Sequence, residues 1–316
     1  MYIHSNIIGI FALNSEFKVI DEHLYKDISE YENHEALISE FLKKHKDLKT
    51  PEPNELSKIL LAFKDEKYLR EFYEKNILLT KADVKASVND DLLLIHSVKT
   101  VWELERCANL LAKRLREWYE IYNPEASRSI ESHEEFAQII LGKDKEELLK
   151  ELGLSVSDSF GAELSEENLH QIKELARELD SVYKLRKKNL EYISSIMDKL
   201  CPNVKAVCDV IVGAKLIECA GSLKRLSQLP ASTIQILGAE TALFRHMKTG
   251  AKSPKHGVII GHPLIANSPY RMHGKIARSL ADKICIAAKI DFFKGEFIGN
   301  DLRKKLEEKF GNQDKK

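Results

Sequence analysis

The stretch that decides the fold of the C-terminal part reads GAETALFRHMKTGAKSPKHGVIIGHPLIANSPYRMHGKIARSLADKICIAAKID, residues 238–291. An apolar helical pattern runs into a loop rich in Gly, Pro and His, and a second helical pattern carries Lys275 and Arg278. From Thr241 to Lys316 the chain has 12 Lys and 4 Arg against 4 Asp and 3 Glu, a net charge of +9. A basic segment that mixes Lys, Arg, His and exposed loop amides suits a phosphate backbone.

The rest of the chain is acidic, because its 316 residues hold 49 basic and 49 acidic side chains in total. Residues 1–100 have a net charge of −4 and residues 101–240 one of −5, so the two ends suggest different kinds of partner. The composition is that of a globular protein, without an apolar run that could cross a membrane and without an N-terminal secretory signal. Five scattered cysteines indicate free thiols in a reducing compartment.

Upstream of the basic stretch, residues 165–200 have the clearest heptad periodicity in the chain. The predicted coiled-coil and dimer positions are Ile172, Leu175, Leu179, Val182, Arg186, Asn189, Ile193, Ile196 and Leu200. Arg186 and Asn189 interrupt the apolar seam, and polar groups there can fix register or pairing. One interpretation is an amphipathic helix on a globular core. The other is a coiled coil that pairs with another helix of the middle region and with a second copy of the chain.

The predicted fold class is mainly α with a small N-terminal α/β domain, a helical coiled-coil middle domain and an all-α C-terminal domain. The boundaries that we predict are 1–120, 121–228 and 229–316. Short strands are expected over residues 2–3, 7–13, 17–20, 77–79 and 92–95. Helices are expected over residues 99–122, 129–140, 143–152, 202–228, 232–247, 275–293 and 301–310. Gly238 would then lie inside a helix, and residues 258–260 would form a short extended piece.

The run GAETALFRHMKTGAKSPKHG, followed by HP and then GKIARSLADKICIAAKID, closely resembles the Nop domain. This domain occurs in core proteins of box C/D guide ribonucleoproteins and in a spliceosomal relative. The family pattern usually has Lys where this chain has Thr241, and RLREWYEIYNPE resembles the start of the family's middle region. The resemblance implies that the first domain docks fibrillarin, the 2′-O-methyltransferase. It also implies that the third domain binds a kink-turn RNA together with the small protein already bound to it.

The basic loop and its flanking helices supply the predicted contacts to RNA and its bound protein. Lys and Arg neutralise phosphates, and His can stack on a base or donate to a phosphate. A helix beginning after Gly274 would also direct its free N–H groups to this site. Gly238 would allow close approach of RNA or of a partner backbone, and Glu240 could accept hydrogen bonds from base amino groups or from a partner protein. The alternative is a solubilising surface, with Gly238 serving close helix packing. The predicted residues are Gly238, Ala239, Glu240, Arg245, His246, Lys248, Lys252, Pro254, Lys255, His256, Arg271, Lys275 and Arg278.

No pattern in the chain indicates catalysis, a metal site or a cofactor. The histidines of the basic stretch lack ligand spacing, and residues 250–253 lack the Gly-Lys pair of a phosphate-binding loop. Cys201, Cys208 and Cys219 lie on one helix face and indicate core packing.

We therefore predict a non-catalytic scaffold without a cofactor or a membrane segment. Its expected partners are box C/D guide RNA, a kink-turn-binding protein, fibrillarin with its S-adenosylmethionine, and a second copy of the chain. The alternatives are a spliceosomal-type Nop protein without a methyltransferase partner and a nucleic-acid enzyme with a dispersed active site. The short chain without a Lys/Glu-rich tail favours an archaeal-type, cytoplasmic protein, or a nucleolar one if eukaryotic.

Overall fold

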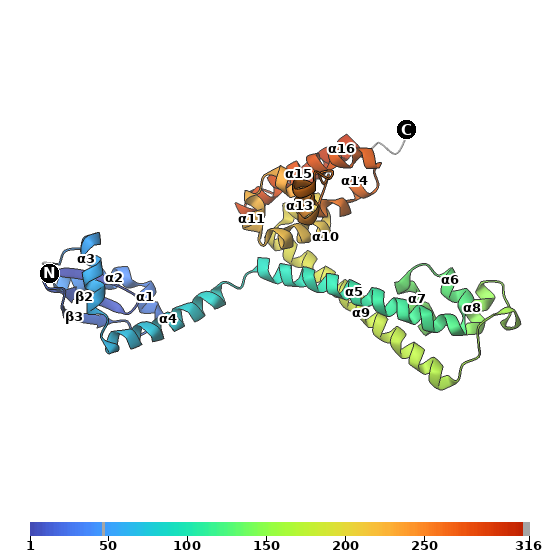
Figure 1. The fold of residues 1–316 in the computed structure, drawn as a ribbon, viewed down its shortest axis with the longest axis horizontal. Coiled ribbons are helices and arrows are strands. Elements are labelled where there is room, and N and C mark those ends of the chain that lie inside the picture. The colour runs from blue at the N-terminus through green and yellow to red at the C-terminus, as the bar shows by residue number, and fades with distance from the viewer. Residues whose placement is uncertain (46–47, 312–316) are drawn as a thin grey trace. The chain divides into compact units, whose positions relative to one another are not determined.

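The computed structural model describes residues 1–45 and 48–311, which form two compact units (Figure 1). We call Met1–Asn89 the N-terminal unit and Asp90–Lys316 the C-terminal unit. The fold is mainly helical, with a small antiparallel sheet at the N-terminus, which confirms the predicted fold class. Among the described residues, no helix is long and apolar enough to cross a membrane.

The N-terminal unit is a three-stranded sheet covered by helices on both faces. Strand order is β1-β2-β3, and all five residues of the central strand are buried. Alternate residues of that strand face opposite sides: Phe11 and Leu13 pack with α3, whereas Ile10 and Ala12 pack with Phe41 of α2. The elements are β1 (Tyr2–Ser5), β2 (Gly9–Leu13), β3 (Val19–Leu24), α1 (Ile28–Glu32), α2 (His34–Lys44), α3 (Pro53–Ala62) and α4 (Glu66–Ala86).

Two of the predicted strands are wrong. Residues 77–79 lie inside α4, and residues 92–95 lie in the first turns of α5 (Asp90–Tyr122). The side chain of Asp65 begins α4 by accepting a hydrogen bond from the Lys67 amide. Leu94 and Val98, one turn apart in α5, are both buried. Short apolar runs of this kind do not distinguish a strand from a buried helical turn.

In the C-terminal unit, α5 and α9 form a long helix pair (Figure 1). Their shared core joins Ala108, Leu115 and Tyr119 of α5 to the buried residues of α9, and α7 adds Phe136. The other elements of this part are α6 (Pro124–Ser129), α7 (His133–Gly142), α8 (Lys145–Glu151), the 3₁₀ turn η1 (Val156–Asp158) and α9 (Glu166–Leu200).

The predicted seam of α9 faces helices of its own chain. Its fully buried members are Ile172, Leu179, Ile193 and Ile196. The others are partly buried, and the two polar ones have local partners: Arg186 pairs with Glu105 of α5, and the Asn189 amide donates to the Leu185 carbonyl. Because helices of the same chain already cover the buried residues of the seam, its role in a dimer stays a prediction.

The remaining helices form one core with the end of α9. Ile193 and Met197 of α9 pack in the same cluster as buried residues of α10, α15 and α16. The predicted boundary at 228/229 therefore crosses a shared core, and the boundary at 120 lies near the end of α5, so the three-part division stays a prediction. The elements are α10 (Pro202–Ala220), α11 (Leu223–Gln228), α12 (Ala231–Ile236), α13 (Glu240–Thr249), η2 (Val258–Gly261), α14 (Pro263–Ala266), α15 (Tyr270–Phe292) and α16 (Gly299–Phe310).

Helix α10 has a kink at Asp209, whose backbone angles are φ 63° and ψ 168°. Such angles are very rare for a residue other than glycine. The kink frees two carbonyls that a straight helix would use. Arg303 of α16 donates to the Ala206 carbonyl (3.3 Å) and to the Asp209 carboxylate (2.8 Å). The His262 ring donates from Nε2 to the Val207 carbonyl (3.1 Å), so both freed acceptors have long-range partners.

Candidate nucleic-acid interface

The helix predicted over residues 232–247 is wrong: α12 and α13 are separated by a turn at Gly238. Gly238 has φ 84°, in the left-handed region, and a Cβ atom there would lie 2.4 Å from Cγ2 of Val258. Gly238 therefore serves the backbone geometry of a turn rather than the interior of a helix. Gly238 is visible in the sequence, but the requirement for glycine at this position depends on Val258, which lies twenty positions further along the chain.

The basic loop is fastened to this turn by two backbone hydrogen bonds. The Gly257 amide donates to the Gln235 carbonyl and the Val258 amide to the Leu237 carbonyl, both at 2.8 Å. A Cβ atom on Gly257 would lie 2.0 Å from the Leu237 carbonyl oxygen, so only glycine permits this approach. Residues 258–260 form part of a 3₁₀ turn, which corrects the predicted extended piece. The loop is thus held at its C-terminal end by α12.

Glu240 has a partner within the turn. Its Oε1 accepts a hydrogen bond of 2.7 Å from the Gly238 amide, and it occupies the first position of α13, after Ala239. A carboxylate in the first turn of a helix is also favoured by the helix dipole. Stabilisation of this turn explains its presence on a basic surface.

No residue of α13 is buried, although four of its ten residues are apolar. Arg245 and Lys248 are exposed, and so are Phe244 (57%) and Met247 (71%). His246 contacts the Ala251 carbonyl with Nδ1, at the end where Gly250 closes the helix. The sequence pattern predicted a helix with apolar residues here, but it did not indicate that Phe244 and Met247 are exposed.

The basic loop also reaches the first turn of α15, which begins at Tyr270 and not at Lys275 as predicted. The Gln235 side chain donates to the Lys255 carbonyl (2.7 Å), and Lys255 Nζ lies 3.9 Å from the Tyr270 ring centroid. The His256 and His273 ring centroids are 5.5 Å apart. Burial, followed by the charges of His273 and Lys255, lowers the pKa of His256. The helix dipole therefore acts at Tyr270, beside the loop, and Gly274 lies inside the helix.

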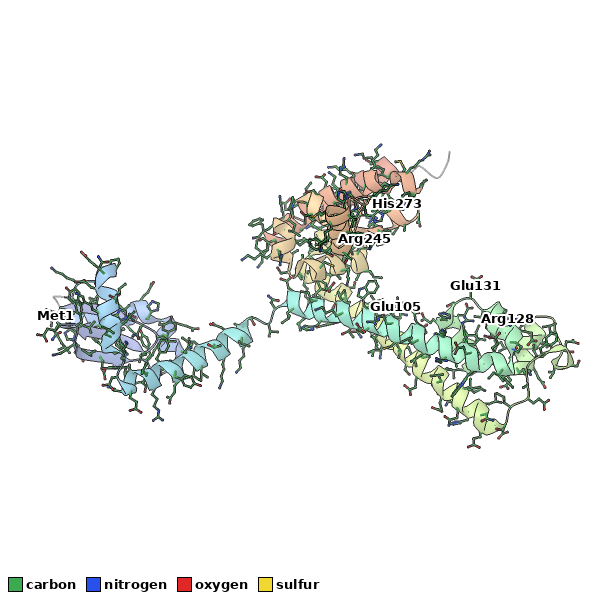
Figure 2. All side chains as sticks on the ribbon, viewed as in Figure 1. Met1, Glu105, Arg128, Glu131, Arg245 and His273 are labelled. Atoms are coloured by element: carbon green, nitrogen blue, oxygen red, sulfur yellow. The ribbon has the colours of Figure 1, made fainter. Side chains whose placement is uncertain are left out.

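Most cations of the predicted site are exposed and have no carboxylate partner. Figure 2 shows Arg245 and His273 within the C-terminal group of helices. Within residues 1–45 and 48–311, none of the seven exposed cations of the predicted site forms an ion pair; they are Arg245, Lys248, Lys252, Lys255, Arg271, Lys275 and Arg278. Cations left unpaired in this way create a positive potential that attracts anionic partners. Pro254 is partly buried in the same loop.

His262, the fourth histidine of the basic stretch, is part of the core. It is 2% exposed, and burial lowers its pKa. Nε2 donates to the Val207 carbonyl, and Nδ1 accepts from the Leu264 amide (3.2 Å). Both ring nitrogens are therefore used in holding the fold.

An all-helical frame that presents unpaired cations together with histidines and exposed aromatic rings defines a nucleic-acid-binding class of protein. Residues 100–312 match the Nop family model, described as "snoRNA binding domain, fibrillarin", and the chain belongs to this family.

Curated relatives extend the comparison. The chain is 39% identical over 243 residues to an uncharacterized NOP5 family protein of Methanocaldococcus jannaschii, covering 72% of this chain and 58% of the relative. It is 35% identical over 253 residues to nucleolar protein 56 of Schizosaccharomyces pombe, covering 73% and 51%. The chain thus spans about half the length of the curated relatives it matches. A crystal structure of a fibrillarin/Nop5p complex shares 25% identity, with a TM-score of 0.45, and covers 95% of this chain and 98% of that chain.

Proposed function

We propose that the chain is a non-catalytic scaffold of a box C/D small ribonucleoprotein. In this role the C-terminal unit binds guide RNA together with a kink-turn-binding protein, and the N-terminal unit holds fibrillarin for RNA 2′-O-methylation. The observation that carries the proposal is the set of seven exposed cations without a carboxylate partner among the described residues, all within the segment that matches the Nop family. The description of that family names both snoRNA binding and fibrillarin.

Helix α13 suits a partner that is part RNA and part protein. Arg245 and Lys248 offer charge to phosphates, whereas Phe244 and Met247 offer apolar surface that phosphates do not use. Exposed apolar residues of this kind mark protein interaction sites when they gather on one element. A kink-turn protein bound to its RNA would present both kinds of surface at once.

The N-terminal unit offers a surface for the methyltransferase on α3 and α4. None of the residues of α4 is buried. Large apolar side chains are exposed on both helices, namely Leu60, Leu61, Leu69, Phe72 and Tyr73. Docking fibrillarin here would let the scaffold contribute to methylation by positioning, which raises the effective concentration of enzyme at the target nucleotide.

A second copy of the chain would need apolar residues of the long helix pair that its own helices leave uncovered. The exposed apolar residues of α5 and α9 include Leu110, Trp118, Ile121, Leu185 and Tyr192. Isologous pairing through them is the default arrangement for a homo-oligomer.

Salt dependence of RNA binding tests the proposal. The affinity of the chain for a guide RNA carrying the kink-turn protein should fall with salt, with a slope of about −0.7 to −0.9 per neutralised phosphate. Lys252→Ala with Lys275→Ala should reduce the magnitude of that slope by roughly 1.5. Lys304→Ala with Lys305→Ala is the control, because both lysines are exposed on α16, outside the predicted site. Equal slopes for the two double variants would contradict the assignment of the surface.

Reconstitution tests the scaffold role itself. The intact chain, fibrillarin, the kink-turn protein and guide RNA should together methylate a target RNA, and omission of the chain should abolish the reaction. Methylation by the chain without fibrillarin would refute a non-catalytic role.

A further inference from the structure

Tyr270 is an exposed aromatic residue of the candidate interface, with its ring beside Lys255 and His273. It is the first residue of α15 and is 69% exposed. Among the residues that the structure describes, its hydroxyl has no hydrogen-bond partner, and its ring contributes to no hydrophobic core. Neither core packing nor a hydrogen bond therefore explains the aromatic ring at this position.

The surroundings of the ring are fixed by contacts that do not involve it. His273, whose ring centroid lies 5.4 Å from that of Tyr270 at an interplanar angle of 65°, is held by contact of its Nε2 with the Ser268 carbonyl (3.0 Å). Lys255, whose Nζ lies 3.9 Å from the ring centroid, is held at its carbonyl by Gln235. Two neighbours of the ring are therefore anchored by contacts of their own, and the backbone of Tyr270 belongs to the first turn of α15, so fewer groups must be ordered when a ligand binds.

Two charge features place this ring in a phosphate-binding environment. Arg271, the next residue, is exposed and unpaired among the described residues, and Lys275 lies one turn further along the same helix. Cationic side chains around an exposed aromatic ring are the composition by which proteins bind single-stranded nucleic acid: bases stack on the ring while cations neutralise the backbone. A base in the interior of a duplex has both faces covered by its neighbours and cannot stack on the ring, whereas an unpaired base can.

We propose that Tyr270 is a stacking platform for one unpaired nucleobase of the bound RNA, with Arg271 and Lys275 on the flanking phosphates. The proposal rests on the proposed function and adds a subsite to it. The platform accepts any of the four bases, because every base has a π-face. It therefore strengthens binding and fixes register without reading sequence.

The test compares three forms of the intact chain in binding the RNA–kink-turn protein complex, by fluorescence anisotropy of labelled RNA. Tyr270→Ala should weaken binding by about 5- to 150-fold, the range for loss of one stacked base, without changing the salt slope. Tyr270→Phe keeps the π-face and should bind within about twofold of the unmodified chain. Phe293→Ala, which removes a ring that is 76% exposed at the opposite end of α15, is the matched control and should have no effect.

RNAs with one abasic nucleotide at each unpaired position in turn identify the base. At one position, the abasic substitution should weaken binding by the unmodified chain as much as Tyr270→Ala weakens binding to the complete RNA. Tyr270→Ala should bind the RNA that is abasic at this position as tightly as it binds the complete RNA.

Three results would overturn the stacking proposal. Tyr270→Ala could bind within twofold of the unmodified chain, or it could show a reduced salt slope. Its loss of affinity could also add to the loss caused by every one of the abasic substitutions. The last would assign the ring to the protein partner. The proposed function would survive all three, because none of them concerns salt-dependent RNA binding by the unmodified chain. Absence of that binding would remove both proposals.

Discussion

Replacing Asp291 with Ala should lower the unfolding free energy of the C-terminal unit by about 3–5 kcal/mol. Asp291 is 8% exposed near the end of α15. Its carboxylate accepts hydrogen bonds from the Asn203 amide (3.1 Å), the Asn203 side chain (2.7 Å) and the Val204 amide (2.8 Å), and so caps the first turn of α10. The alanine variant leaves three buried donors without an acceptor, at about 1–2 kcal/mol each.

The loss of stability should affect more than the contact between Asp291 and Asn203, because Asn203 also binds the start of α16. Its Oδ1 accepts a hydrogen bond of 2.7 Å from the Ile298 amide. The three groups therefore connect the beginning of α10, the end of α15 and the beginning of α16. Asp291→Asn retains one oxygen but turns an NH₂ group toward a backbone donor, so we expect a smaller loss of about 1–3 kcal/mol.

Urea unfolding followed by tryptophan fluorescence measures this effect selectively. The chain has two tryptophans, Trp102 and Trp118, and both belong to the C-terminal unit. Asp282→Ala is the control on the same helix, because that side chain is 58% exposed and pairs only with the neighbouring Lys283 among the described residues. It should change stability by less than about 0.5 kcal/mol. A loss below about 1 kcal/mol for Asp291→Ala, or equal losses for both variants, would refute the reasoning.

Three further predictions concern assembly, pH and the division of the chain. Light scattering at micromolar concentration should report a dimer, and Leu110→Asp, at a site 69% exposed, should yield a folded monomer; a monomeric unmodified chain would contradict this. Because burial lowers the pKa of His262, the unfolded state takes up a proton first as the pH falls through about 6.5, so unfolding free energy should decrease by at most about 1.4 kcal/mol per pH unit. That slope should be shallower in His262→Asn, and an unchanged slope would exclude His262 as its source. Residues 1–89 alone should bind fibrillarin and not RNA, residues 90–316 should do the reverse, and methylation by the unlinked mixture would show that tethering is unnecessary.

The helices with strong local signals were predictable from the sequence. Pro202 begins α10 as expected, Gly250 ends α13 in the left-handed conformation, and the last helix lies within two residues of its predicted start. The errors arose where the deciding contact is distant. The break at Gly238 depends on Val258, and the kink at Asp209 depends on partners from α16 and from the segment before α14. No local pattern encodes such contacts.

The charged part of the candidate site was predictable for a related reason. Lysine and arginine side chains stay in solvent almost wherever the backbone places them, so a basic segment in the sequence becomes a basic surface in the fold. Exposure of an apolar side chain depends instead on what packs over it. Phe244, Met247 and Tyr270 were therefore missed, since nothing in the sequence shows that their helix faces have no covering element.

The kink at Asp209 bears on how a scaffold of this kind can hold RNA at a defined place. Its backbone conformation costs about 1–3 kcal/mol and persists only where surrounding contacts offset that cost. Those contacts come from Arg303 and His262, and His262 lies in the segment that also leads to the first turn of α15. Since α9, α10 and α15 share one core, the candidate interface is joined to the long helix pair by packed helices rather than by a linker. A rigid connection is what positioning by a non-catalytic protein requires, because effective concentration falls steeply once the connection loosens.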